Sequence, residues 1–394
     1  MKLGEIKGWR RENGDFGIRN HIVVLSSVAC ANHAALEIAR RTGAIPIIQE
    51  EGACGMFGED RKRFLRCMAN VGSHPNVAWT LVVGLGCEGI DAHQLADEIS
   101  KRGRNAESLL IQELGMDKTV EKGVELVNRA KENLTPRRET AGVEELVIGL
   151  KCGASDYTSG LISNPSVGKA VDILIEHGGT AIITERLELV GAEQILARRA
   201  KSKEVAEDFL RRIKKAVEDV NKRGVDWIGS QPSMGNIKGG LTTIEEKSLG
   251  AVKKAGNAQL EGCLDYGEKP KGRGLYFMDG PGYDVKAVSG LMCAGSHIIL
   301  FTTGLGTYLG SPVSPVIKIT GNPTTARKLR DAIDVDLSVL LEEIISRDAS
   351  LDEILEIGGR MILEEIVRVA NGKLTKAEKS QHIEFSIELT GIIA

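Results

Sequence analysis

Four cysteines follow apolar runs that the sequence predicts as buried β-strands. They are Cys30, Cys54, Cys87 and Cys152. Ligands of open parallel sheets bind outside the carboxyl ends of the strands, so we expect these thiols to face one common edge. Three thiolates with an open coordination position suit iron, either as a single ion or as a cluster with an exposed iron. For each cysteine, the alternative is a small buried hydrophobic residue.

A glycine turn leads into a predicted helix in the stretch GNIKGGLTTIEEKSLG. Gly239 and Gly240 precede Thr242 and Thr243, and either threonine could cap the helix with the glutamate three residues later. A helix N-terminus that follows such a turn is a ready site for a carboxylate or phosphate. Lys238 adds a positive charge. An ordinary capped helix is the alternative.

Further polar residues stand beside predicted strands, where they could contact a ligand. Arg19 and Asn20 belong to the stretch GIRN, and Arg19 could clamp a carboxylate. A surface arginine is the alternative. Thr302 and Thr303 end another apolar run, and Ser155 follows Cys152.

Apolar runs and amphipathic stretches alternate along most of the chain. This alternation predicts parallel sheets with helices on their faces. The predicted strands are His21–Val28, Ala44–Gln49, Trp79–Leu85, Glu107–Gln112, Glu145–Cys152, Thr180–Thr184, Gly274–Met278, His297–Phe301, Val316–Ile319 and the edge strand His382–Leu389. We expect an α/β protein of two doubly wound, mostly parallel-sheet domains, residues 1–138 and 139–394, with the site in the cleft between them.

Composition excludes several classes of protein. The 394 residues carry 51 Lys and Arg against 54 Asp and Glu. This balance argues against a nucleic-acid binder, which usually has a basic face. No apolar run reaches the roughly 18 residues of a transmembrane helix, and the charged N-terminus lacks the apolar stretch of a signal peptide. We therefore expect a cytoplasmic protein with no membrane partner. Seven cysteines, an odd count, argue against a disulfide framework.

The loops together resemble one family. The stretches GWRRENGDFGIRN, ACGMFG, HPN, VVGLGCE, KCGASDYTSGLISNPSVG, GGLTTIEEKSLG, LYFMDGPG and LFTTGLGTYLGSPVSPVIKITGN are similar, in this order, to the large catalytic region of the altronate and galactarate dehydratase family. That family includes the large subunit of (2R)-3-sulfolactate sulfo-lyase. The resemblance implies an iron-dependent lyase that performs β-elimination on sugar acids or related 2-hydroxy acids.

The chain departs from the family pattern in three places. One is the loop EEGACG, where Glu50 and Glu51 stand near the position of a histidine that the family often has. Full-length dehydratases begin with a small domain that this sequence does not show, so the resemblance implies a separately encoded small subunit. We also expect a homo-oligomer. Leu305 stands where the family usually has an arginine in its TTGRG loop. This difference removes an anion contact and weakens the case for a sugar diacid as the substrate.

We expect Cys54, Cys87 and Cys152 to hold the iron, and Arg19, Lys238 and the threonine-capped helix to orient the acid. Removing a proton next to a carboxylate requires a positioned base, typically worth about 10²–10⁴-fold. Glu88 or Asp156 would supply it, and His74 is a weaker candidate.

Three functions remain open at this point. The first is a dehydratase that converts a sugar acid into a 2-keto-3-deoxy acid. The second is the sulfo-lyase large subunit, which releases sulfite and pyruvate. The third is a non-catalytic, ligand-binding subunit.

Overall fold

The computed structural model describes residues 4–50, 54–134, 137–227, 229–346 and 350–390. Near the N-terminus, four parallel strands form a sheet of order β4-β3-β5-β6. These strands are β3 (His21–Ser26), β4 (Ile45–Ile47), β5 (Val77–Gly84) and β6 (Ala106–Leu110). They are the four strands that the apolar runs predict for the first domain.

Helices cover both faces of this sheet, as expected for a doubly wound domain. The apolar sides of α1 (Asn32–Thr42) and α5 (Met116–Asn133) share one hydrophobic core on one face. The other face packs against α2 (Gly58–Gly72) and α3 (Ala92–Lys101). The short helix α4 (Ile111–Leu114) precedes α5.

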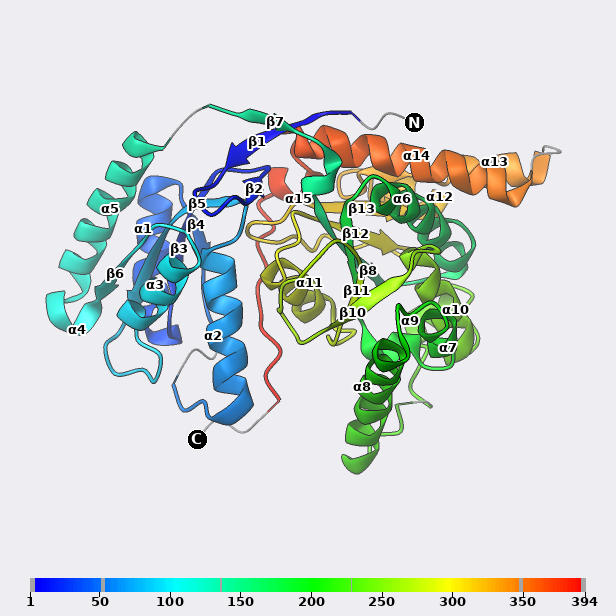
Figure 1. The fold of residues 1–394 in the computed structure, drawn as a ribbon, viewed down its shortest axis with the longest axis horizontal. Coiled ribbons are helices and arrows are strands. Elements are labelled where there is room, and N and C mark those ends of the chain that lie inside the picture. Colours follow the sequence, from blue (N-terminus) through cyan, green and yellow to red (C-terminus); the bar gives the residue numbers. More distant parts are fainter. Residues whose placement is uncertain (1–3, 51–53, 135–136, 228, 347–349, 391–394) are drawn as a thin grey trace.

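The rest of the chain builds a second, larger parallel sheet of order β10-β11-β9-β8-β12-β13-β14 (Figure 1). Its strands are β8 (Val147–Gly153), β9 (Thr180–Ile183), β10 (Leu260–Leu264), β11 (Gly274–Met278), β12 (Ile298–Thr303), β13 (Val316–Thr320) and β14 (Val335–Asp336). The expected architecture of two α/β domains is therefore confirmed. The apolar runs did not predict the edge strands β10 and β14.

Long helices cover the outer face of the larger sheet. They are α6 (Asn164–Glu176), α8 (Lys203–Lys222) and α14 (Leu351–Ala370), whose apolar sides share one core. On the inner face, α11 (Asp284–Cys293) packs against α2 of the first domain. One hydrophobic cluster contains residues of both domains, so the two sheets are joined by a common core.

Shorter elements complete the chain. They are α7 (Glu193–Ala197), α9 (Met234–Lys238), α10 (Ile244–Val252), α12 (Pro323–Lys328), α13 (Val339–Ser346) and α15 (Lys376–Lys379). Across the described ranges, no helix combines the length and the apolar character needed to cross a bilayer.

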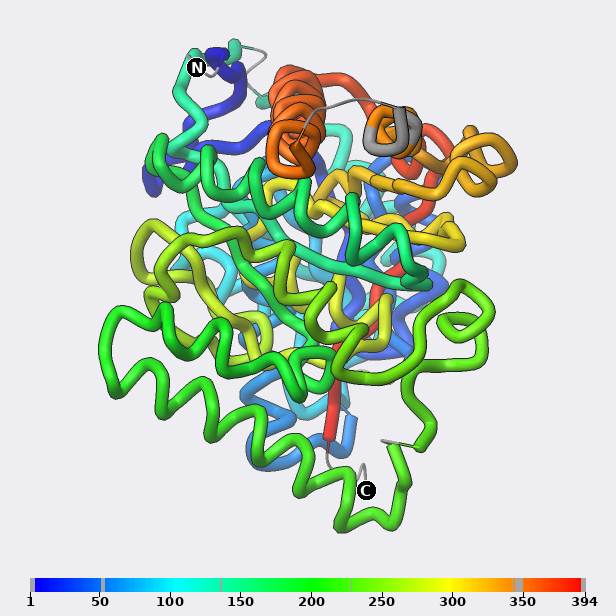
Figure 2. Tube along the Cα trace, turned by 90° about the vertical axis from the view of Figure 1, so that its right-hand side faces the viewer, coloured from blue at the N-terminus to red at the C-terminus, as the bar shows by residue number. Residues whose placement is uncertain are grey.

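Two further features differ from the sequence prediction. A small antiparallel sheet of β1 (Ile6–Arg10), β2 (Phe16–Gly17) and β7 (Glu139–Ala141) was not expected. The predicted edge strand near the C-terminus is wrong, because residues 382–389 belong to no strand. This segment instead runs between α2 and the second domain, with Phe385 and Ile387 buried in the shared core (Figure 1 and Figure 2). Its alternating pattern reflects burial against two packed surfaces.

Candidate active site

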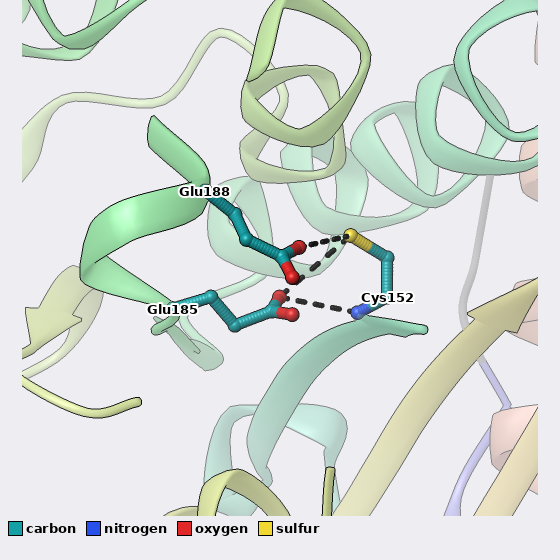
Figure 3. Close-up of side chains that lie close together, drawn as sticks. All are labelled: Cys152, Glu185 and Glu188. Carbon is teal, nitrogen blue, oxygen red and sulfur yellow. Dashed lines mark hydrogen bonds between the residues drawn. The ribbon is translucent and has the colours of Figure 1, made fainter. Parts of the chain in front are cut away.

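The carboxyl ends of two neighbouring strands bring a thiol and two carboxylates together. Cys152 lies at the end of β8, and Glu185 and Glu188 lie just after β9, which pairs in parallel with β8. The Cys152 Sγ lies 3.7 Å from a carboxylate oxygen of each glutamate (Figure 3). Within the described ranges, only these three side chains form a group with three or more His, Cys, Asp or Glu ligand atoms within 4.8 Å of one another. By donor type and spacing, this group could hold a metal ion.

Glu185 anchors the group from a constrained position. Its φ of 75° lies in the left-handed region, which costs a residue with a Cβ about 1–3 kcal/mol. Its fully buried carboxylate accepts hydrogen bonds from Lys151 Nζ at 2.5 Å and Lys254 Nζ at 2.6 Å. The backbone N–H of Cys152 donates a third at 3.1 Å. These contacts compensate the removal of three charged groups from water.

The two lysines and Glu185 hold one another in their charged forms. Burial opposes charge on all three groups, but Lys151 and Lys254 lower the pKa of Glu185 to about 2. The acidic groups beside the lysines raise both lysine pKa values above the ordinary range, again against the effect of burial. Lys151 also contacts Asp284 at 2.9 Å. Lys151, Lys254 and Glu185 therefore all carry their charges near neutral pH.

The pKa of Glu188 is shifted in the opposite direction from that of Glu185. Burial and the neighbouring charge of Glu185 raise the pKa of Glu188 above its usual value, although nearby lysines oppose the shift. One of its oxygens accepts a hydrogen bond from Lys247 Nζ at 3.2 Å, and the other faces the Cys152 thiol. Two carboxylates whose environments separate their pKa values are suited to different roles.

Cys152 itself is a weak acid in this arrangement. Burial and the negative charge of Glu185 raise the pKa of its thiol to about 11, which outweighs the opposing effect of Lys254 at 3.1 Å from the sulfur. The thiol therefore keeps its proton at neutral pH.

The group borders a cavity of about 500 Å³, a volume typical of small-molecule sites. Its lining contains both polar and apolar side chains. The lining residues are Gly153, Ala154, Ser155, Leu187, Glu188, Trp227, Gln231, Ser233, Asn236, Ile244, Lys247, Gly282, Tyr283 and Asp284. All belong to the second domain, so the expected position in a cleft between the domains is wrong for this cavity.

Two of the predicted site residues belong to this region. Cys152 is part of the metal-suited group, and Ser155 lines the cavity. Sequence reasoning missed Glu185, Glu188, Lys247 and Lys254. A signal for Lys247 was present, because it lies in the same EEKSLG stretch that follows the predicted glycine turn.

Cys54 and Cys87 do not join Cys152. Both are exposed and lie outside the group that contains it. They follow strands of the four-stranded sheet, whereas Cys152 ends a strand of the other sheet, so the expected common edge does not exist. The roles of Cys54 and Cys87 as iron ligands stay predictions.

Arg19 has a structural role in this fold. Its guanidinium donates to both oxygens of Glu378, at 2.8 and 3.1 Å. The remaining N–H groups donate to the backbone carbonyls of Ile18, Val369 and Lys373. All five donors are occupied, so the predicted carboxylate clamp is not formed. Its neighbour Asn20 accepts a hydrogen bond from Arg11 at 2.6 Å.

His74 is also structural. It is fully buried, its Nδ1 accepts the N–H of Asn76, and its Nε2 lies 3.2 Å from the carbonyl oxygen of Ser296. Burial holds its pKa well below the ordinary value, so the ring is neutral. His74 does not line the cavity, and its predicted role as a weaker candidate base has no support from this geometry.

The two carboxylates expected to act as bases hold loops in place. Glu88 accepts hydrogen bonds from the Ser27 hydroxyl and from the backbone N–H groups of residues 85–87. Asp156 accepts from the hydroxyls of Thr158 and Ser159 and from the Asn322 amide. Neither of them lines the cavity.

Four other predicted contacts do not line the cavity. Thr243 is the N-cap of α10, with its hydroxyl accepting the Glu246 N–H, which confirms the helix start. Thr242 donates to the Glu246 carboxylate. Lys238 is exposed at the end of α9, and Gly240 makes the turn with a φ of 91°.

The hydroxyls of the last two residues of β12 are engaged within the fold. That of Thr302 donates to Asn164, and that of Thr303 accepts the N–H of Gly306. As substrate contacts, they stay predictions.

Comparisons with known proteins agree with the fold and the loops. The second domain of D-galactarate dehydratase/altronate hydrolase matches residues 8–135, and the C-terminal part of D-galactarate/altronate dehydratase matches residues 143–392. The chain is 38% identical to (2R)-sulfolactate sulfo-lyase subunit beta of Chromohalobacter salexigens, covering 96% of this chain and 95% of the relative. It is 34% identical to altronate dehydratase of Bacillus subtilis and 33% identical to that of Escherichia coli, covering 98% of this chain and 78% of each relative. The chain therefore belongs to the D-galactarate/altronate dehydratase family of lyases.

Proposed function

We propose that this chain removes a leaving group from C3 of a small 2-hydroxy acid and yields a 2-keto acid, in the cavity beside Glu188. Removal of the C2 proton supplies the electron pair for a C2=C3 double bond while the bond from C3 to the leaving group breaks. The resulting enol rearranges to the 2-keto acid. The observation that carries this proposal is a carboxylate and a lysine side by side on the wall of one cavity.

Glu188 is the proposed base. It lines the cavity and, unlike Glu88 and Asp156, is not engaged in holding a loop. Its raised pKa brings it closer to the working pH than an ordinary carboxylate, which favours proton transfer. The buried Glu185 keeps its charge beside Glu188 and sustains that shift.

Lys247 is the proposed partner of the substrate carboxylate. Its side chain is only 8% exposed, and its ammonium lies 3.2 Å from Glu188 and 3.3 Å from Gln231. A cation at this place would orient the acid and stabilise the negative charge that develops when the C2 proton leaves. The same contact aligns the acid with the base.

Iron is the cofactor that the family resemblance implies, and the thiol and carboxylates of the group are suitable ligand types. When bound, it would act as a Lewis acid toward the leaving hydroxyl. The ammonium of Lys254 already lies among these ligands, at 3.1 Å from the sulfur of Cys152. A metal ion that binds this group would have to displace or compete with that ammonium. The steps above therefore use only the residues of this chain.

Water is the first leaving group that we propose, as in the altronate dehydratases. Sulfite is the second, and the end-to-end match with a sulfo-lyase subunit favours it. Because that relative is named subunit beta, we also propose that this chain works with a separate small subunit.

The test is an anaerobic assay of the full chain with Fe²⁺, with and without the small subunit, on D-altronate and on (2R)-3-sulfolactate. Formation of a 2-keto acid from altronate supports a dehydratase, and sulfite release supports a sulfo-lyase. No turnover of either acid with metal bound and the subunit present would contradict the proposal and favour a non-catalytic, ligand-binding role.

A further inference from the structure

A second cavity lies on the other side of the short turn that carries Glu188. The turn is η4 (Arg186–Leu189), and Leu187 lines both cavities. The second cavity has a volume of about 490 Å³, and residues of α2, α8 and the C-terminal segment are part of its lining. Its lining residues are Arg63, Arg186, Leu187, Arg212, Lys215, Ala216, Asp219, Val220, Arg223, Asp279, Lys286, Glu388, Leu389 and Thr390.

The lining is strongly positive. It contains six arginines and lysines against three acidic side chains. The cationic residues come from α2, η4, α8 and α11, so four separate elements converge on one hollow. The first cavity is different, because Lys247 is the single cationic residue of its lining and faces two acidic ones.

Three arginines form the rigid part of this lining. Their side chains are only 17–21% exposed, and acidic neighbours fix each of them. Arg186 contacts Glu388 at 2.5 Å, and Arg63 reaches the same carboxylate at 3.5 Å. Arg212 contacts Asp265 at 2.8 Å, outside the lining. Glu388 and Asp279 are thus paired with these arginines, whereas Asp219 pairs with Lys222, which is outside the lining.

Three further cations have no acidic partner. In the described part of the chain, no carboxylate lies within salt-bridge distance of Lys215, Arg223 or Lys286. Lys215 and Arg223 are exposed and Lys286 is partly buried, and all three line the same cavity as the partly buried arginines. Such a surplus attracts anions, and a multivalent anion can contact several of these groups at once.

We propose that this second cavity binds a small anion with two or more negative charges, such as a phosphate or a di- or tricarboxylate. The site is separate from the proposed chemistry and does not depend on it. Arg186 lies between Glu185 and Glu188 in the sequence, so an anion here contacts the turn that positions both carboxylates. The site also joins the two domains, because Arg63 comes from α2.

The test is isothermal titration of the full chain with inorganic phosphate, with chloride adjusted to keep the ionic strength constant. The site variant carries Lys215→Ser, Arg223→Ser and Lys286→Ser. The control variant carries Lys203→Ser, Arg211→Ser and Lys214→Ser, which removes the same charge from exposed positions of α8 outside the lining.

We expect phosphate to bind the wild-type chain with one site, and the Kd to rise at least about tenfold in the site variant, since each charge-assisted contact contributes strongly. The control variant keeps the wild-type Kd within about twofold. Absence of binding to the wild type, or equal weakening in both variants, would overturn the proposal. Because binding is measured without turnover, this result is independent of whether the chain is a lyase.

Discussion

The ammonium of Lys254 lies 3.1 Å from the sulfur of Cys152. The same ammonium donates to Glu185 at 2.6 Å, so a positive group stands among the side chains best suited to hold a metal. Any metal ion that enters this group must compete with a lysine of the protein itself.

Replacing this lysine tests that competition. We expect Lys254→Met to bind Fe²⁺ at least about tenfold more tightly than the wild type, because the variant removes a cation and leaves the thiol accessible. Lys151 still neutralises Glu185 in this variant. The measurement is anaerobic titration with Fe²⁺. The control is Lys253→Met, which changes the exposed neighbouring lysine.

The same titration distinguishes which of the candidate cysteines binds the iron. Adding Cys152→Ser to Lys254→Met should abolish the gain, whereas Cys54→Ser and Cys87→Ser should not. Affinity should also rise with pH, since a metal ligand must lose the proton that Cys152 holds with a pKa of about 11. Loss of iron in Cys54→Ser and Cys87→Ser alone would instead place the metal at those thiols.

Acid should destabilise the protein through Glu185. Lys151 and Lys254 outweigh the effect of burial and lower its folded-state pKa to about 2 from an ordinary value of 4.5. Its contribution is therefore complete above pH 4.5 and is lost as the pH falls toward 2. Urea unfolding at a series of pH values gives the free energy of unfolding as a function of pH. The slope of this free energy against pH should be smaller in Glu185→Gln than in the wild type. The control Glu364→Gln, an exposed residue, should keep the wild-type slope. Equal slopes in all three proteins would refute the ion-pair assignment.

Two lysines are candidates for binding the substrate carboxylate. The sequence predicts Lys238, whereas the structure places Lys247 in the cavity lining. We expect Lys247→Met to raise KM at least about tenfold, because the substrate carboxylate loses its cation. The acid limb of the pH–activity profile should also shift to higher pH. Lys247 lowers the pKa of Glu188, so its removal raises that pKa. Lys238→Met should leave KM unchanged, as this exposed residue does not line the cavity. The opposite pattern would restore Lys238 as the binding residue.

Arg19 should matter for stability and not for catalysis. Arg19→Met leaves a largely buried Glu378 without its partner, and such losses cost about 3 kcal/mol in unfolding free energy. Urea unfolding measures this change. Arg40→Met removes the ion pair between an exposed arginine and Glu37 and should leave the free energy of unfolding nearly unchanged. A tenfold change in KM of Arg19→Met, with stability retained, would favour the substrate clamp instead.

Local patterns predict the strands of this protein well. The apolar runs at His21, Trp79 and Glu145 each correspond to a parallel strand, because buried strands have continuous apolar sequences. The same reasoning placed Cys152 at a strand end, where a ligand site is expected. It misread residues 382–389, since burial between two packed surfaces produces the same alternation as an edge strand.

The candidate site could be predicted only in part, because it depends on contacts between distant residues. Glu185 is held by Lys254, which lies 69 residues later in the chain. Its left-handed backbone gives no signal in the stretch TERLELVG. Conversely, Glu88 stands in a prominent glycine loop, yet its carboxylate is used to hold that loop. Residue type and position after a strand do not show whether a side chain is already engaged.

The most direct test of the account is the turnover of Glu188→Gln, measured beside its affinity for the substrate. We predict that kcat falls by about 10²–10⁴-fold while the substrate still binds, because the amide cannot accept the C2 proton. Exchange of that proton with deuterium from solvent should stop as well. Glu245→Gln, an exposed glutamate of α10, should retain wild-type kcat. Wild-type turnover and exchange in Glu188→Gln would contradict the account.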